Sequence, residues 1–211
     1  MSTPEHTYPV RFSIDYPDRS LNRATTAFRL FVAIPIFIVL TAVSGGIWQW
    51  SHGDGSTAAA AAGGLLFLAP LLMIVFRQKY PRWWFDWNLE LQRFSNRAAA
   101  YLLLMDDRYP STTDQQSVTL DYDYPDVERD LNRWLPLVKW FLAIPHYVVL
   151  AVLDLAGVFA VIAAWFAILF TGRYPKGIFR FVEGVIRWNN RVVGYACTLV
   201  TDQYPPFSLA A

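Results

Sequence analysis

Residues 135–170 read LPLVKWFLAIPHYVVLAVLDLAGVFAVIAAWFAILF, and this stretch decides the fold that the sequence predicts. A helix needs about 20 mostly apolar residues to cross the hydrocarbon of a membrane. The run is long enough for two short crossings, 135–153 and 155–170, and Asp154 and Gly157 are the residues that favour a turn between them. We therefore predict a tight helical hairpin here, with a partly re-entrant pair of helices as the alternative.

The first half of the chain contains a second pair of apolar runs. Residues 28–43 are apolar apart from Arg29 and Thr41, and Pro35 is expected to kink a helix at this point. Residues 58–76 contain no charged side chain. Together with the second half, these runs predict four transmembrane helices.

The composition supports a membrane protein. It is 55% hydrophobic and 17% charged, with a mean hydropathy of +0.25, whereas a soluble domain is roughly 45–50% apolar and about 25% charged. A net charge of +1 provides no basic face for nucleic acid. Cys197 is the only cysteine, which excludes an intrachain disulfide and a cysteine-based zinc cluster.

Short motifs recur in the same order along the chain, which predicts an internal duplication. The first copy has a longer loop, at 46–64, so the separation of equivalent motifs changes there. The predicted units are 8–110 and 117–209. The recurring motifs are Asp15-Tyr16-Pro17 with Asp123-Tyr124-Pro125, Asn22-Arg23 with Asn132-Arg133, Ala33-Ile34-Pro35 with Ala143-Ile144-Pro145, Tyr80-Pro81 with Tyr174-Pro175, Asn96-Arg97 with Asn190-Arg191, Tyr101 with Tyr195, and Asp107 with Asp202.

Each unit has two further elements. The segments 84–105 and 179–199 place apolar residues three and four apart and are too polar to cross lipid, so we expect amphipathic helices in the membrane interface. A helix packed in water against its own partner is the alternative. The segments 10–16 and 117–124 alternate apolar and polar residues, which predicts two strands that pair as a small sheet.

The distribution of basic residues predicts an orientation. All 18 Lys and Arg lie outside 41–64 and 150–172, which contain the hairpin turns. The positive-inside rule then places both termini in the cytoplasm. The expected fold is an all-α membrane protein with four transmembrane helices in two parallel tandem repeats, each with an interfacial amphipathic helix and a short cytoplasmic extended segment.

The second unit ends in two distinctive stretches, WFAILFTGRYP at 165–175 and DQYPPFSL at 202–209. Together with Ala143-Ile144-Pro145-His146, they make residues 117–209 resemble a bacterial membrane family catalogued as domain of unknown function 4389. The first unit departs from the pattern, since FRQK at 76–79 replaces FTGR. The family has no assigned activity, so the resemblance implies a location in the bacterial inner membrane and no catalytic residue.

Polar residues inside the apolar runs are functional candidates, because they are costly in a membrane. His146 lies at membrane depth, and a hydrogen bond to a neighbouring helix is its simplest role. Asp154 is either a solvated turn residue or, in a re-entrant hairpin, a proton or cation site.

Six basic residues are candidates for binding lipid headgroups: Arg23, Arg29, Arg97, Arg133, Lys139 and Arg191. Arg29 and Lys139 occupy equivalent positions in the two units and can extend to the headgroups. Topological anchoring is the alternative role. The Asn-Arg pairs at 96–97 and 190–191 are also expected to brace the amphipathic helices against Asp107 and Asp202.

The sequence contains no glycine-rich phosphate loop, nucleophile elbow or metal-ligand spacing, so we expect no enzyme, no cofactor and no metal. The predicted function is a membrane scaffold or accessory subunit that binds a protein partner through a cytoplasmic collar, formed by the helices 84–105 and 179–199. A small carrier or anionic-lipid-binding module is the alternative, and lipid or stress sensing is a third. Expected partners are membrane lipids and a protein or a second copy of the chain.

Overall fold

The computed structural model describes residues 8–17, 19–44, 59–112 and 114–210, except for the side chains of Leu30, Phe37, 41–44 and 59–67. The described chain is mostly helical. Its elements are β1 (Val10–Ile14), α1 (Arg23–Val32), α2 (Ile34–Ser44), α3 (Ala59–Arg77), α4 (Arg82–Leu102), β2 (Val118–Tyr122), α5 (Val127–Asp130), the 3-10 turn η1 (Leu135–Leu137), α6 (Lys139–Leu142), α7 (Ile144–Thr171) and α8 (Lys176–Ala196).

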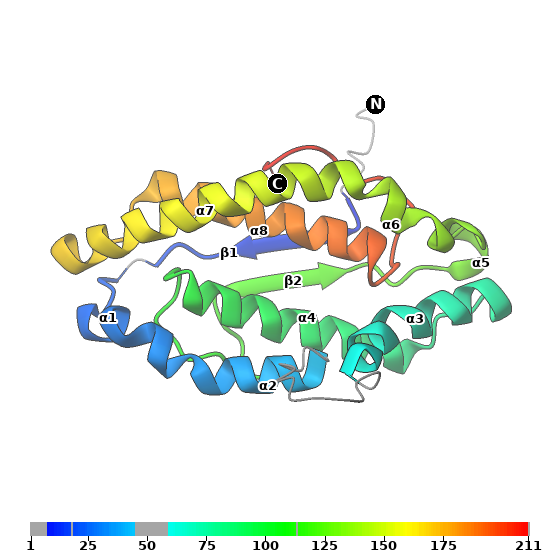
Figure 1. The fold of residues 1–211 in the computed structure, drawn as a ribbon, viewed down its shortest axis with the longest axis horizontal. Helices are drawn as coiled ribbons and strands as arrows, with labels where there is room; N and C mark the ends of the chain where they lie inside the picture. Colours follow the sequence, from blue (N-terminus) through cyan, green and yellow to red (C-terminus); the bar gives the residue numbers. More distant parts are fainter. Residues whose placement is uncertain (1–7, 18, 45–58, 113, 211) are drawn as a thin grey trace, which may run out of the picture.

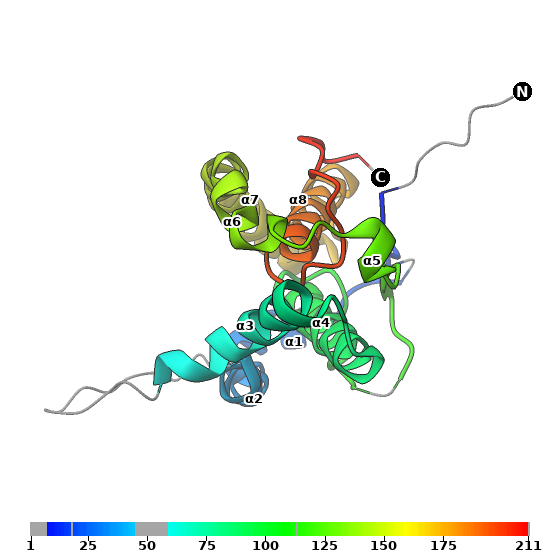
Figure 2. The same ribbon diagram turned by 90° about the vertical axis from the view of Figure 1, so that its right-hand side faces the viewer.

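The elements form three layers. β1 and β2 pair antiparallel, with Phe12 opposite Leu120, which confirms the predicted pairing of the two extended segments. α8 packs against β1, and α4 packs against β2 (Figure 1). Seen end-on, α7 and the helices α2 and α3 lie on the side of α4 and α8 away from the strands (Figure 2).

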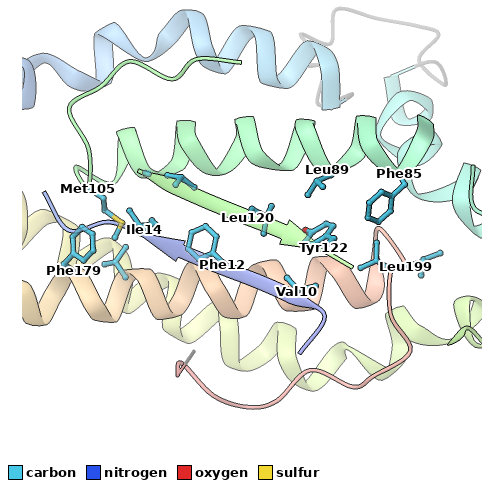
Figure 3. Close-up of a cluster of buried hydrophobic side chains, with 14 of the residues drawn as sticks. Val10, Phe12, Ile14, Phe85, Leu89, Met105, Leu120, Tyr122, Phe179 and Leu199 are labelled. Atoms are coloured by element: carbon cyan, nitrogen blue, oxygen red, sulfur yellow. The ribbon is translucent and has the colours of Figure 1, made fainter. Parts of the chain in front are cut away.

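The main core lies between the strands and the helices α4 and α8. Because side chains alternate across a strand, Val10, Phe12 and Ile14 point to one face, as do Leu120 and Tyr122. They meet aromatic and aliphatic side chains of the helices and of the turns that follow them (Figure 3). Full burial of each large apolar side chain contributes about 1.5–3 kcal/mol. The helix and turn residues are Phe85, Leu89, Met105, Phe179 and Leu199.

The free edges of both strands are closed by arginines. Arg187 Nε donates to the carbonyl oxygen of Phe12 at 3.0 Å, and Arg93 Nε donates to the carbonyl oxygen of Leu120 at 2.8 Å. Exposed strand edges recruit other strands. These two bonds therefore protect the sheet from pairing at these positions.

α7 is one continuous helix of 28 residues, so the predicted hairpin is wrong. Asp154 and Gly157 both lie inside the helix, and the chain turns only at Gly172, whose φ of 73° is a left-handed C-cap that favours glycine. An apolar run of this length is compatible with a hairpin or with one long helix. The structure forms the long helix, with Leu150, Ala164 and Ile168 buried against the protein on one face.

The prediction of four transmembrane helices in two parallel repeats is also wrong. Among the described residues, α7 is the one helix long and apolar enough to cross a membrane. The first predicted span is bent by 47° between 23–29 and 34–40. In α3, the stretch whose side chains the structure describes, Leu68–Arg77, forms only a shorter apolar helix. Even with the bent pair counted as one span, the total is two. Most of the loop at 46–64 lies outside the described residues.

α4 and α8 confirm the predicted amphipathic helices, and both pack inside the protein. Phe179, Trp188 and Tyr195 of α8 are 2–4% exposed. α4 buries Phe85 and Leu89, at 3% and 8% exposure, but leaves Trp83 and Trp87 at 64% and 41%. The two helices also meet directly, since the side chains of Asn96 and Asn190 bond to each other. The alternative, packing against a partner helix, is therefore correct.

Candidate membrane interface

An exposed apolar stripe runs along the whole of α7. Its members follow one another at intervals of three or four, as on one helical face, and each is 48–78% exposed. The opposite face of α7, with Leu150, Ala164 and Ile168, is buried against the protein. The stripe consists of Val148, Val152, Leu155, Phe159, Ile162, Phe166 and Phe170.

Neighbouring helices extend this stripe into a broad surface, which we call the apolar layer. It comprises the exposed apolar side chains of α1, α2, α3, α6 and α7. Exposed apolar patches on soluble monomers rarely exceed a few hundred Å². An apolar layer spread over five helices therefore indicates a surface that is covered in use. Outside α7, its members include Phe28, Phe31, Ile34, Ile38, Leu68, Leu72, Phe76, Trp140 and Phe141.

The opposite face of the molecule is polar. The outward residues of the sheet include Arg11, Ser13 and Thr119, all exposed. Arg11 forms a two-pronged ion pair with Asp123, at 3.0 and 2.7 Å. Arg93 pairs with Asp121 at the edge of the same sheet. The molecule is therefore amphipathic as a whole, with the buried helices α4 and α8 between its two faces.

α7 is fixed alongside α8. Trp188 Nε1 donates to His146 Nδ1 at 3.0 Å, and Asn189 Nδ2 donates to Asp154 Oδ1 at 2.9 Å. Further along, Trp165 Nε1 donates to the carbonyl oxygen of Thr26 in α1 at 3.2 Å. α8 also packs on β1, so α8 lies between α7 and the sheet (Figure 2).

These bonds give His146 and Asp154 structural partners. His146 is fully buried and stacks on Phe207, with ring centroids 4.0 Å apart. The hydrogen bond that His146 accepts from Trp188 in α8 gives it the simplest of the roles predicted from the sequence. Asp154 is an exposed mid-helix residue rather than a turn residue.

Arg29 and Lys139, two of the predicted headgroup residues, are buried against carboxylates. Arg29 is 1% exposed, pairs with Asp107, and donates to the carbonyl oxygens of Tyr101 and Asp106 at 2.8 and 2.9 Å. Lys139 is 0% exposed, and its ammonium lies 2.7 Å from Asp202. Burial lowers the pKa of Lys139, and the Asp202 carboxylate partly offsets this shift.

The other four predicted headgroup residues differ in their surroundings. Arg97 donates to the carbonyl oxygen of Ser111, and Arg191 donates to those of Ser208 and Ala210, so both hold the segments that follow their helices. Arg133 donates to the carbonyl oxygen of Val75, at the end of α3. Arg23 is exposed and lies over Gly172.

Asp107 and Asp202 are bonded differently from the expectation. Their partners are Arg29 and Lys139, and they also accept from the backbone N–H groups of Asn22 (2.7 Å) and Asn132 (2.5 Å). The Asn-Arg pairs do not bond them. Asp107 therefore joins the start of α1 to the chain that follows α4, and Asp202 joins the residues before η1 to the chain that follows α8.

Sequence reasoning missed one buried carboxylate, Asp106. It is 8% exposed and accepts from Ser117 Oγ at 2.5 Å and from the N–H and guanidinium of Arg108. Burial opposes ionisation, but these donors outweigh it, so the pKa of Asp106 is lowered. No repeated motif marks Asp106, because the recurring aspartate is its neighbour Asp107.

Several of the contacts occur twice. Tyr16 Oη donates to the carbonyl oxygen of Tyr174, and Tyr124 Oη donates to that of Tyr80, both at 2.5 Å. Arg29 lies over the Tyr101 ring at 4.5 Å, as Lys139 lies over Tyr195 at 5.1 Å. In the tyrosine pairs, each strand segment contacts the helix start of the other half of the chain.

Within the described ranges, no group of three His, Cys, Asp or Glu side chains is placed to hold a metal ion. A family model described as a domain of unknown function (DUF4389) matches residues 134–208, about a third of the chain, from η1 to the C-terminal segment. No curated protein and no solved structure matches the chain.

Proposed function

We propose that this protein is a non-enzymatic membrane scaffold that rests with its apolar layer in one leaflet and presents its polar sheet to water. The observation that carries the proposal is the exposed apolar stripe of α7, which faces away from the rest of the protein. A body with one apolar side and one charged side lies in the plane of a membrane with its apolar side in the acyl region. The bacterial inner membrane is the proposed location, with both termini on its cytoplasmic side.

The polar neighbours of α7 favour this placement over a crossing helix. If α7 stood upright in the bilayer, α8 and the strands beside it would stand at the same depth. The exposed Arg11–Asp123 pair and the partly buried Arg93–Asp121 pair would then stand at the depth of the hydrocarbon, where charged groups are costly. With α7 lying flat, every one of these charges remains in water.

The tandem duplication belongs to the same proposal. The contacts that occur twice support two copies of one unit, 8–110 and 117–209. The copies are intertwined, because β1 of the first packs on α8 of the second while β2 of the second packs on α4 of the first. An intertwined pair places both apolar halves on one face, as a scaffold lying on a membrane needs.

A partner would bind the polar sheet face. The predicted collar helices, α8 and most of α4, pack inside the protein, so the scaffold role moves to the outward side chains of β1 and β2. Ser13 and Thr119 lie opposite each other there and are both exposed. Their short polar side chains leave an accessible surface bordered by the Arg11–Asp123 ion pair.

Flotation with phosphatidylcholine vesicles tests membrane binding. The triple variant Val152→Asp, Leu155→Asp, Phe159→Asp places three charges on the stripe, and we expect vesicle binding to fall at least about 100-fold, since each side chain loses about 1.5–3 kcal/mol of burial. The matched control Ser13→Asp, Gln115→Asp, Thr119→Asp adds the same charges at exposed polar positions and should bind within about twofold of wild type. Equal losses in both variants would contradict the proposal.

Co-purification from native membranes tests the scaffold role. We expect a stoichiometric protein partner that is lost with Ser13→Asp, Thr119→Asp and retained with the control Thr25→Asp, Thr171→Asp, which changes exposed positions on other elements. Repeated recovery of the protein alone would contradict this role while leaving membrane binding intact.

A further inference from the structure

A basic pocket lies at the end of the molecule where α7 turns into α8. Its volume is about 460 Å³, and its walls come from the segment after β1 and from the α7–α8 turn. Three of its lining residues, Arg19, Arg173 and Lys176, are cationic. None of the described lining residues is acidic. The sequence places one acid, Asp18, between the lining residues Pro17 and Arg19, so the segments that form the pocket carry a net charge of about +2.

Two of the three cations, Arg173 and Lys176, are not neutralised within the described residues. The Lys176 ammonium lies over the Tyr16 ring, 5.5 Å from its centre, and Tyr16 is held by its bond to the Tyr174 carbonyl oxygen. In the described part of the chain, no carboxylate lies within ion-pair distance of Arg173 or Lys176. Arg19 approaches Asp106 at 3.7 Å, a long contact for a side chain that is 62% exposed.

The backbone adds to this positive potential. Lys176 is the first residue of α8, a helix of 21 residues whose N-cap, Pro175, provides no side-chain hydrogen bond. The first N–H groups of a helix have no partner within the helix, and the helix dipole makes that end favourable for anions. The pocket therefore lies at the positive end of the α8 dipole.

The opposite end of the molecule provides an internal comparison. A pocket of about 620 Å³ there has the same plan, with Tyr124 bonded to Tyr80 and Arg82 over the Tyr124 ring at 4.7 Å. Its two cations, however, share the pocket with Asp126 and Glu128, and Arg82 pairs with Asp86 at 3.1 Å. Its lining is electrically balanced, which makes it a matched control site.

The basic pocket also adjoins the apolar layer. Phe170 in the last turn of α7 is 78% exposed and precedes Arg173 by less than one helical turn. We infer that this pocket binds a phosphate-bearing anion, which at the membrane is the headgroup of an anionic phospholipid. The inference rests on the proposed function in one respect: the membrane placement makes a lipid the source of the phosphate. The positive charge of the pocket does not depend on that placement.

Vesicle titration tests the inference with two double variants. Arg173→Gln, Lys176→Gln removes two charges from the basic pocket, and Lys79→Gln, Arg82→Gln removes two from the balanced pocket. Affinity is measured for phosphatidylcholine vesicles with and without about 20% phosphatidylglycerol, and the ratio of the two is compared. Each basic residue near an anionic surface contributes about fivefold, so we expect the first variant to lower this ratio about 20-fold and the second at most about threefold.

The outcomes separate the two claims. Equal losses of the ratio in both variants would overturn the pocket, since they would reflect net charge alone. Weak binding of wild type to neutral vesicles would instead contradict the proposed function. Glycerol phosphate, titrated without vesicles, tests for a soluble source of the phosphate. Binding of glycerol phosphate that is lost in the Arg173→Gln, Lys176→Gln variant supports the pocket. If wild type neither binds glycerol phosphate nor prefers vesicles with phosphatidylglycerol, the pocket is overturned.

Discussion

Asn96 and Asn190 donate to each other's side-chain oxygen, at 2.8 and 2.7 Å, where α4 and α8 meet beneath the sheet. Both are buried, at 6% and 4% exposure. Each amide also donates to the carbonyl oxygen four residues earlier in its own helix. The reciprocal pair therefore joins the two halves of the chain at their centre.

This pair predicts a strong coupling. Asn96→Leu alone leaves the Asn190 amide without its partner, and we expect a loss of about 1–3 kcal/mol in the free energy of unfolding. Asn96→Leu with Asn190→Leu removes both polar groups and should cost less than the sum of the single variants. A double-mutant cycle by urea unfolding measures the coupling; additive losses would show that the bonds are not formed.

The buried Arg29–Asp107 pair predicts an asymmetry between ion pairs. Arg29→Met leaves Asp107 buried without its cation, and we expect a loss of about 3–5 kcal/mol. Arg82→Met, at the exposed Arg82–Asp86 pair, should cost at most about 1 kcal/mol. Thermal unfolding in one detergent compares them, and similar losses would place Arg29 at the surface.

Two glycines test the path of the helices. An added Cβ at Gly157 meets nothing within 4 Å, so Gly157→Ala should stabilise α7 by up to about 1 kcal/mol. At Gly194, a Cβ would lie 2.6 Å from Val10 Cγ2, so Gly194→Ala should destabilise the contact between α8 and β1. Unfolding midpoints check both; a loss at Gly157 would indicate a turn there instead of a helix.

Asp106 predicts a loss of stability in acid. Because its folded pKa lies below the ordinary value of 3.8, it contributes stability above that value, and the contribution disappears as the pH falls through the folded pKa. Asp106→Asn should therefore cost on the order of 1 kcal/mol at pH 6 and progressively less below pH 3.8. Urea midpoints at pH 6, 4 and 3 measure this difference, with the exposed Asp114→Asn as control; a constant difference would contradict it.

The sequence predicted the elements better than their surroundings. Alternation over 10–16 and 117–124 identified both strands, and periodicity identified α4 and α8, because these patterns depend on local geometry. Periodicity does not distinguish lipid from protein as the apolar neighbour, which is why α4 and α8 were placed in an interface. Hydropathy failed for the same reason at α7, whose apolar residues face α8 on one side and open surface on the other.

The candidate site was predictable only in part. The predicted duplication made Arg29 and Lys139 equivalent, but their carboxylate partners lie far away in sequence, so the pairing required the fold. The basic pocket was missed because Arg19, Arg173 and Lys176 come from separate segments and lack a recurring motif. The apolar layer could not be foreseen from the sequence, since it exists only once α7 lies flat on α8.

The depth of α7 in the membrane tests the central claim most directly. Spin labels at Val148, Phe159 and Phe170, in a Cys197→Ser background, lie on one exposed face, and the outer two are about 33 Å apart along the helix at 1.5 Å per residue. Accessibility to oxygen and to a water-soluble relaxation agent then gives the depth of each label in vesicles. We expect three similar, shallow depths; a label at Phe159 near the bilayer centre, with Val148 and Phe170 at opposite surfaces, would show that α7 crosses the membrane and contradict the account.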